Sequence, residues 1–328
     1  IGANTVNKVA VPLDAAVVSN NTIENLGIHV TAEQPVAVYG VNYEYYCSDS
    51  FLSYPVQACG TEYYCISYES SISQYPASNF TIVSVYDHTT ITLTPSVTSG
   101  IHAAGTTYSI TMDSGQTYCV YDEAGGKDIT GSHIISDKPV AVFSGHEACN
   151  IPVDVLAGNH ITEQILPVSD WNSTYRVIPY LDRSEDTIRV LAAFDGTGLS
   201  VNGMKIATLN KGEFTDQIIS RYSRITANKS VLVAHYSHGA KYEGEHATFG
   251  DPSMCIIPSA AQFRKEYVFS TAHMEIKSNY INLIVPNSNI SDIRLDGTLL
   301  NGSIFSQIDE DYSGARLSIG QGIHSIFG

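Results

Sequence analysis

A short sequence pattern occurs twice in this chain and a third time in weaker form. Residues 27–40 read GIHVTAEQPVAVYG and residues 131–145 read GSHIISDKPVAVFSG, with one spacing of Gly, His and Pro; residues 225–235 read ITANKSVLVAH. Proline fixes φ and cannot donate a backbone hydrogen bond, so it suits the start of a strand, and the β-branched run after it suits a buried strand. Each copy therefore predicts strand, polar turn, strand, in a series of similar units.

A second block follows each copy in the same order. Pro55 leads to Tyr63 and Pro167 leads to Tyr175 at the same offset, while Pro258 leads to Tyr267 with one more residue between them. Two motifs that recur in one order favour internal duplication over chance.

A third element has the alternation of a β-strand. In 81–95, Ile91 and Leu93 alternate with threonines, so the two kinds of residue lie on opposite faces. The pattern returns in 187–203 and 279–297, each with a Gly-containing turn, and each copy predicts a hairpin.

Helical periodicity is nearly absent, and the best candidate is one short helix over 259–266. The prediction is an all-β fold of tandem antiparallel β-sandwich-like units, with three repeats and complementary partial ends. The predicted bounds are 1–76, 77–184, 185–273 and a partial unit at 274–328.

The two ends of the chain carry opposite halves of the repeat. The first unit has its Gly-x-His block but no leading hairpin, whereas 274–328 has the hairpin and then Gly322-Ile323-His324. Three explanations stay open: the ends close on each other, one chain completes the next, or the chain is cut after Gly328. An uncompleted sheet edge is a template for another strand.

Composition excludes several classes of protein. There are 17 Lys+Arg against 33 Asp+Glu, a formal net charge of −16, which disfavours nucleic-acid binding. Aromatic residues make up 10% of the chain, too many for a disordered acidic tail. No uncharged apolar run is long enough to predict a membrane span. The chain starts at Ile1 without a signal peptide, which suggests a processed form or a fragment.

The cysteines and potential glycosylation sites indicate an extracellular or cell-surface protein. An even number of cysteines without a C-x-x-C pair suits a disulfide framework, although six reduced buried thiols are the alternative. The disulfide candidates are Cys47, Cys59, Cys65, Cys119, Cys149 and Cys255. The Asn-x-Ser/Thr acceptors are Asn20, Asn79, Asn172, Asn228, Asn289 and Asn301.

Clusters that resemble metal sites are weak. His235 and His238 precede Glu243, Glu245 and His246, but residues three apart in a strand face opposite sides, so a solvated loop is the preferred interpretation. Two acidic turns have the ligand type for Ca²⁺ but not the EF-hand spacing, so solvated turns are preferred and no cofactor is predicted. These turns are Asp182, Glu185 and Asp186, and Asp309, Glu310 and Asp311.

A hydrolase interpretation of Ser144-Gly145-His146-Glu147 fails. A nucleophile elbow needs G-x-S-x-G on a turn into a helix, but Phe143 precedes the serine and no helix is predicted after it. The repeat explains the segment as the end of a strand. The chain is therefore predicted not to be an enzyme.

A tyrosine-rich segment is the candidate partner-binding surface. Tyrosine gives a large contact area at low entropic cost, so it is favoured in binding surfaces. The candidates are Tyr43, Tyr45, Tyr46 and Tyr54. The alternative is a pair of strands with half-buried tyrosines.

These motifs together resemble the IgGFc-binding protein N-terminal domain family. The resemblance rests on SDKPVAVFSGH at 136–146, EQILPV at 163–168 and GDPSM at 250–254, and it covers about 20–328. It implies a non-catalytic secreted or cell-surface module found in adhesive proteins. No residue motif for Fc binding could be matched.

The chain departs from the family at one cysteine. The family usually has a Cys where this chain has Gly158, so Cys149 lacks its usual partner and Cys255 is the replacement guess. The residues also favour two further pairs, Cys47 with Cys59 and Cys65 with Cys119. The family domain usually continues beyond the equivalent of Gly328 with another strand.

The prediction from sequence is a non-catalytic extracellular structural or adhesive protein. It would be a building block of a cell-surface, matrix or filament assembly, joined head to tail through complementary chain ends. The alternative is a soluble module that binds a glycoprotein or a glycan through loops such as 43–54 and 235–249.

Overall fold

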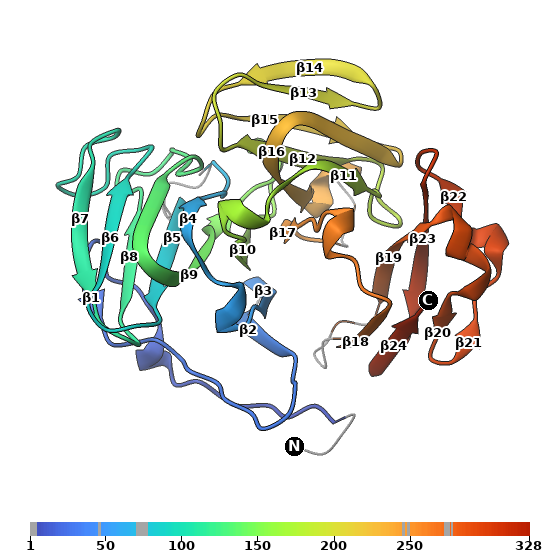
Figure 1. Cartoon of the computed structure of the whole chain (residues 1–328), viewed down its shortest axis with the longest axis horizontal. Coiled ribbons are helices and arrows are strands. Elements are labelled where there is room, and N and C mark those ends of the chain that lie inside the picture. Colours follow the sequence, from blue (N-terminus) through green and yellow to red (C-terminus); the bar gives the residue numbers. More distant parts are fainter. Residues whose placement is uncertain are drawn as a thin grey trace.

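The fold is that of a computed structural model, which describes residues 5–44, 47–69, 78–244, 247, 250–271, 276 and 278–328. It is all-β, with antiparallel sheets and short 3₁₀ helices, and its strands form three groups arranged in an arc (Figure 1). In the described ranges no helix is long and apolar enough to cross a membrane. The 3₁₀ helices are η1 (Leu13–Ala15), η2 (Val56–Ala58), η3 (Val168–Asp170), η4 (Ala240–Glu243), η5 (Ala260–Gln262), η6 (Asn287–Asp292) and η7 (Gly302–Ile304).

The first group is built around one long strand, β9 (His133–Cys149), which pairs with four other strands along its length. The other strands of this sheet are β1 (Ile23–Glu24), β4 (Gly60–Tyr64), β5 (Ser78–Ser84), β6 (Thr89–Thr94), β7 (Tyr108–Met112), β8 (Thr117–Tyr121) and β10 (Asn159–Gln164).

The second group repeats this plan around β16 (Ser223–Ser237). The other strands of this sheet are β11 (Asn172–Val177), β12 (Asp186–Ala192), β13 (Thr197–Val201), β14 (Met204–Leu209), β15 (Phe214–Ile219) and β17 (Ser253–Ile256).

The third group consists of two smaller sheets, and the N-terminal hairpin forms a separate two-stranded sheet. One sheet has the order β19 (Asn279–Pro286), β23 (Tyr312–Ile319), β22 (Ser306–Gln307). The other has the order β18 (Glu266–Ser270), β24 (Ile323–Phe327), β20 (Arg294–Leu295), β21 (Thr298–Leu299). The hairpin is β2 (Val38–Glu44) with β3 (Cys47–Ser53).

The sequence repeat corresponds to a structural repeat. The hydroxyl of Tyr63 donates to the carbonyl of Val140 in β9 at 2.8 Å, and the hydroxyl of Tyr175 donates to that of Val231 in β16 at 2.6 Å. Both tyrosines are buried and pin the strand that follows the Pro-containing block to the long strand. The all-β prediction with repeated sandwich-like units is thus confirmed.

The predicted turn within the Gly-x-His block is wrong, because β9 and β16 each run through it without interruption. Pro139 tolerates this position because the pairing changes there. β6 pairs with β9 up to Ser136 and β5 pairs with β9 from Val140 onward, so the missing N–H lies between two ladders.

The predicted leading hairpins are also wrong as hairpins. β5 and β6 are strands, as alternation indicated, but they pair with opposite halves of β9 rather than with each other. β12 and β13 flank β16 in the same way. Alternation fixes which face of a strand is buried, but it does not name the strand beside it.

The predicted helix over 259–266 is limited to η5, and β18 begins at Glu266. Ser259 and Gln262 form a capping box, which explains the helical signal, but the chain after η5 is extended.

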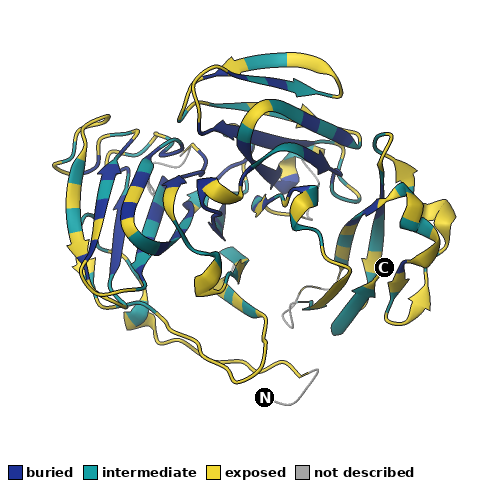
Figure 2. Cartoon of the chain, in the orientation of Figure 1, coloured by how far each residue is buried: buried dark blue, intermediate teal, exposed yellow. Residues whose placement is uncertain are grey.

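The cores lie between the strands of each group (Figure 2). The largest core includes Phe80, Ile134 and Val142 from the first group and also Leu232 and Tyr236 from the second, so the two groups share one apolar interior. The third group has a smaller core of its own. The predicted unit boundaries stay a prediction.

Candidate functional site

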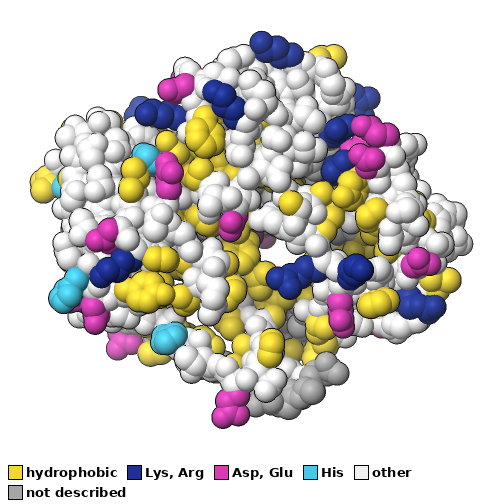
Figure 3. Space-filling view, in the orientation of Figure 1, with side chains coloured by type: hydrophobic (Ala, Val, Ile, Leu, Met, Phe, Trp, Pro, Cys, Tyr) yellow, Lys and Arg dark blue, Asp and Glu magenta, His cyan; other side chains and the backbone are white. Residues whose placement is uncertain are grey.

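The exposed face of the β2–β3 hairpin carries a row of large apolar side chains. Tyr39, Val41 and Tyr43 alternate along β2 and are 43%, 51% and 59% exposed, while Leu52 lies opposite Tyr39 on β3 and is 40% exposed. Alternation places the three β2 residues on one face of the strand. Figure 3 shows hydrophobic side chains on the surface near the middle of the molecule, with charged groups scattered around them.

The opposite face of the hairpin is fixed by Phe51. The tip of its ring lies only 2.1 Å from the position that a Cβ atom on Gly40 would take. The packed ring therefore leaves room for glycine at this position. The same ring meets that of Phe143 in β9 edge to face, with centroids 5.2 Å apart. The hairpin therefore packs on the first group of strands with one face and leaves the other face open.

Polar contacts with β10 hold the hairpin in place. The side chain of Asn159 accepts a hydrogen bond from the N–H of Ser48 and donates one to its carbonyl, both at 3.0 Å. A carboxylate oxygen of Asp49 accepts from the N–H of Thr162 at 2.8 Å, and the side chain of Gln164 accepts from the N–H of Tyr54 at 2.7 Å. Side chains of Asn159 and Gln164 on β10 and of Asp49 on β3 thus join the hairpin to the edge of the first sheet.

Two carboxyl groups lie where the hairpin packs on β10, that of Asp49 on β3 and that of Glu163 on β10. Burial raises the pKa of Asp49 to about 7, although the N–H groups of Thr162 and Ser50 lower it in part. Burial also raises the pKa of Glu163 in β10 well above its usual value, and the charge of Asp49 adds to this effect. The raised pKa values of both groups favour their protonated forms between the hairpin and β10.

We expect the protein to lose stability as the pH rises from about 4 to about 7. A carboxyl whose pKa is raised by folding binds its proton more tightly in the folded state, so ionisation of Asp49 opposes folding. Asp49→Asn should flatten this slope and raise the free energy of unfolding at pH 8 by about 2 kcal/mol. Urea unfolding of both proteins at pH 5 and pH 8 measures this.

The exposed Asp292 supplies the control for this experiment. Asp292→Asn should leave the pH dependence of the wild-type chain unchanged. Equal slopes for the wild-type chain and Asp49→Asn would show that Asp49 does not hold the proton.

Of the tyrosine candidates, Tyr43 lies in β2 and Tyr54 lies just after β3. Tyr43 is the most exposed residue of the row on β2, and Tyr54 follows β3 and is half-buried. Tyr45 and Tyr46 lie outside the described residues. Whether these side chains bind a partner stays a prediction.

The expectation of a solvated loop at His235 and His238 is wrong, because both are buried at the end of β16. His235 lies 3.0 Å from the carboxylate of Asp186 and stacks on Tyr180, while His238 contacts the hydroxyl of Thr187 at 2.8 Å. Glu243 accepts from the N–H of Ser184 at 2.9 Å, and Glu245 and His246 are outside the described residues. The described residues contain no group of three metal-ligating side chains.

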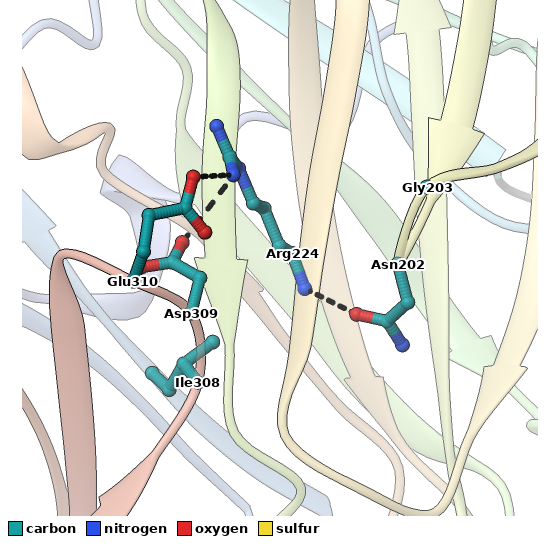
Figure 4. Close-up of a pocket in the computed structure, with 6 residues that line it drawn as sticks. All are labelled: Asn202, Gly203, Arg224, Ile308, Asp309 and Glu310. Carbon is teal, nitrogen blue, oxygen red and sulfur yellow. Dashed lines mark hydrogen bonds and ion pairs between the residues drawn. The ribbon is translucent and has the colours of Figure 1, made fainter.

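The acidic turns are only partly solvated. Asp186 is fully buried and accepts from the N–H of Tyr180, and Asp309 is 5% exposed beside Arg176. A polar groove next to Asp309 is lined by Asn202, Gly203, Arg224, Ile308, Asp309 and Glu310. In it the guanidinium of Arg224 contacts the carboxylates of Asp309 and Glu310, while the backbone N–H of Arg224 donates to the side chain of Asn202 at 2.8 Å (Figure 4). The carboxylates there are engaged by arginine.

Ser144 and His146 are both buried in β9. The hydroxyl of Ser144 donates to the carbonyl of Asn79 at 3.2 Å, and a ring nitrogen of His146 accepts from the N–H of Ala148 at 3.0 Å. Burial lowers the pKa of His146 to about 4. Both side chains make hydrogen bonds with backbone groups of the sheet, as expected for the strand that the repeat indicated.

All six cysteines are free thiols in the structure. The thiol of Cys47 accepts from the N–H of His160 at 3.0 Å, and Cys149 lies opposite Asn159 in the neighbouring ladder. The structure thus brings Cys47 and Cys149 to adjacent residues of β10, a proximity that spacing along the chain did not indicate. The predicted pairings and the six predicted glycosylation sites, of which Asn228 and Asn301 are the exposed ones, stay predictions.

Sequence reasoning missed the buried carboxyls of Asp49 and Glu163. They come from strands more than one hundred residues apart, and a lone acidic residue in a strand gives no sign of what covers it. The exposed row on β2 had a signal, because Tyr39, Val41 and Tyr43 share one parity.

The comparisons with known proteins agree on one family. The family described as IgGFc binding protein matches residues 49–327. A human protein named IgGFc-binding protein is 26% identical over 249 residues, which are 73% of this chain and 4% of the human protein. No solved structure matches the chain. The chain therefore belongs to the IgGFc-binding protein family.

Proposed function

We propose that this chain is a non-catalytic extracellular module that binds a protein partner on the exposed face of the β2–β3 hairpin. The observation that carries the proposal is the row of Tyr39, Val41, Tyr43 and Leu52. Exposed aromatic and aliphatic side chains on a rigid element are the usual anchors of a protein interface.

The base of the hairpin supports this role. Phe51 and Asp49 fix the hairpin to β9 and β10, so its exposed face is held in one shape before a partner arrives. Preorganisation lowers the entropic cost of binding. The formal charge of −16 favours partners with a neutral or basic surface.

The name of the human relative suggests the first partner to test, the Fc fragment of IgG. We expect the immobilised chain to bind Fc, and Tyr43→Ala to weaken binding about tenfold or more, as loss of a tyrosine anchor does. Surface plasmon resonance over a concentration series measures this.

Tyr86→Ala is the matched control, because Tyr86 is 47% exposed and lies away from the hairpin, after β5. It should bind as the wild-type chain does. Equal affinities for the wild-type chain and Tyr43→Ala would place the binding surface elsewhere, and no binding of Fc by the wild-type chain would refute Fc as the partner.

A second candidate function is the structural one, a building block joined to further copies through complementary ends. It is favoured by two strand edges that pair with no other strand in the described residues, those of β2 and β19. Glycan recognition, disulfide bonding and placement at a cell surface belong to the same proposal of an extracellular module.

A further inference from the structure

β2 is the structural equivalent of the second half of β9. In β9, Ser144 lies opposite Glu163 of β10, and in β2, Gly40 lies opposite Phe51 of β3. This register matches each residue of 36–42 to the residue 104 positions later, in agreement with the sequence repeat. β2 is therefore the half-strand that follows the proline of the repeat.

β19 is the structural equivalent of β5 and β12. The N–H at the end of each strand donates to a carbonyl in the turn before the neighbouring strand: Ser84 to Gln116, Ala192 to Glu213 and Asn287 to Asp311, at 2.8 to 3.0 Å. Each strand then pairs with the strand after that turn, β8, β15 or β23.

β19 and β2 differ from their structural equivalents in the pairing of one edge. β5 and β12 each pair on their other edge with the second half of a long strand. In the described residues no strand pairs with that edge of β19, and none pairs with the edge of β2 away from β3. Within the described residues, the third group thus has an unfilled strand position, and the N-terminal hairpin has a half-strand of the fitting type.

Tyr267 is the equivalent of Tyr63 and Tyr175 in the third group. Its hydroxyl accepts from the N–H of Arg264 at 2.9 Å, as the hydroxyls of Tyr63 and Tyr175 accept from the N–H groups of Gly60 and Asn172. Tyr267 is 42% exposed, whereas Tyr63 and Tyr175 are 1% and 2% exposed. The equivalents of Tyr267 are buried because the long strand covers them and accepts their hydroxyl hydrogens.

We infer that the free edge of β19 binds β2 of a second copy of this chain. Transfer of the register of β5 with β9 places Val41 opposite Asn282, Gly40 opposite Leu283 and Val38 opposite Val285. The register of β12 with β16 gives the same result. The hydroxyl of Tyr267 then donates to the carbonyl of Val36 of the second copy.

A second copy fits because both elements are anchored within one chain. β3 holds β2 to β10, and the ion pairs of Arg176 with Asp309 and of Arg224 with Glu310 hold the third group to the second, so the two edges stand apart (Figure 1). A tether gives no advantage in effective concentration when it cannot bring its two sites together. Self-pairing would require the chain to break one of these sets of contacts, whereas a second copy needs no such change.

Apart from Pro286 at the end of β19, neither edge has the usual protection against strand addition. β19 contains no Lys, Arg, Asp or Glu, and residues 38–43 contain none either. Natural sheet edges are commonly protected by such charges. Residues 29–37, which precede β2 in the chain, are exposed and irregular. They therefore do not compete with β24, which already pairs with β18 and β20 in the third group, when β2 docks. The contact joins different surfaces of two copies, so it produces rings or open filaments.

Cysteine cross-linking in the full chain tests the register. Two single variants, Val41→Cys and Asn282→Cys, are mixed and oxidised, and linked peptides are identified by mass spectrometry. We expect a 41–282 disulfide between chains, because directly opposed residues lie within disulfide reach. The control mixture, Tyr43→Cys with Ile284→Cys, is four residues out of register, about 13 Å, and should give about tenfold less product.

Light scattering over a concentration series gives the second measurement. The mass should grow with concentration, and Tyr267→Phe should weaken association about 2- to 10-fold through loss of one hydrogen bond. A constant monomer mass would overturn the inference. So would a 41–282 disulfide that forms only within single chains when Val41→Cys and Asn282→Cys are combined in one chain. These outcomes are independent of Fc binding, because the inference does not depend on the partner of the hairpin face.

Discussion

Arg189→Met is expected to lower the free energy of unfolding by about 3 to 5 kcal/mol, as removal of one member of a buried ion pair does. Arg189 on β12 is 3% exposed and lies where the first two groups of strands meet. It donates to the carboxylates of Asp128 at 2.5 Å and Asp216 at 2.8 Å and to the carbonyl of Ser67 at 2.7 Å. Methionine fills a similar volume but leaves two carboxylates without their cation.

Urea unfolding at pH 7 measures this loss, with Arg221→Met as the control. Arg221 is exposed in the turn between β15 and β16, and its replacement should change stability by less than about 0.5 kcal/mol. Adding Asp128→Asn and Asp216→Asn to Arg189→Met should recover part of the loss, because the triple variant buries no unpaired charge. Similar losses for Arg189→Met and Arg221→Met would contradict the role assigned to Arg189.

The repeat in the sequence predicted the units of this fold better than the strands within them. Pro139 and Pro35 occupy equivalent places, and Tyr63 and Tyr175 make equivalent hydrogen bonds, so duplication was visible in both blocks. The path of β9 through Pro139 was not visible. It depends on β5 and β6 sharing one long strand, a tertiary arrangement that periodicity does not encode.

The candidate site, too, could be predicted from the sequence only in part. Tyr43 could be found because aromatic residues gather near it in the sequence. The base beneath it could not be found, because the environment of Asp49 is created by Thr162 and Glu163, which come from a distant part of the chain. Burial of a carboxyl is a property of the packed state, and so is its pKa.

Asp309→Asn is expected to lower the free energy of unfolding at pH 7 by about 3 kcal/mol, because it leaves the buried guanidinium of Arg176 without its charge partner. Asp309 accepts from Arg176 at 2.7 Å and from the N–H groups of Asp311 and Tyr312. The ring of Tyr312 covers the guanidinium at 3.8 Å. These contacts join the second group of strands to the third.

The pKa of Asp309 determines how the effect of Asp309→Asn on stability should change with pH. Burial raises the pKa of Asp309, but the hydrogen bonds from Arg176 and the two N–H groups outweigh it, so its pKa lies below the usual value. A carboxyl with a lowered pKa stabilises the fold above its unfolded pKa of about 4, and the stabilisation is lost as the pH falls through the folded pKa. The difference between wild type and Asp309→Asn should therefore be full at pH 7 and shrink in acid.

Asp311→Asn is the matched control in the same turn. Asp311 is 65% exposed and 4.0 Å from Arg176, so its replacement should cost less than about 0.5 kcal/mol. A larger loss for Asp311→Asn than for Asp309→Asn would mean that Arg176 depends on the outer carboxylate. If Asp309→Asn also abolishes concentration-dependent association, the ion pair that anchors the third group would be required to present the edge of β19, since that edge belongs to the group that Asp309 holds in place.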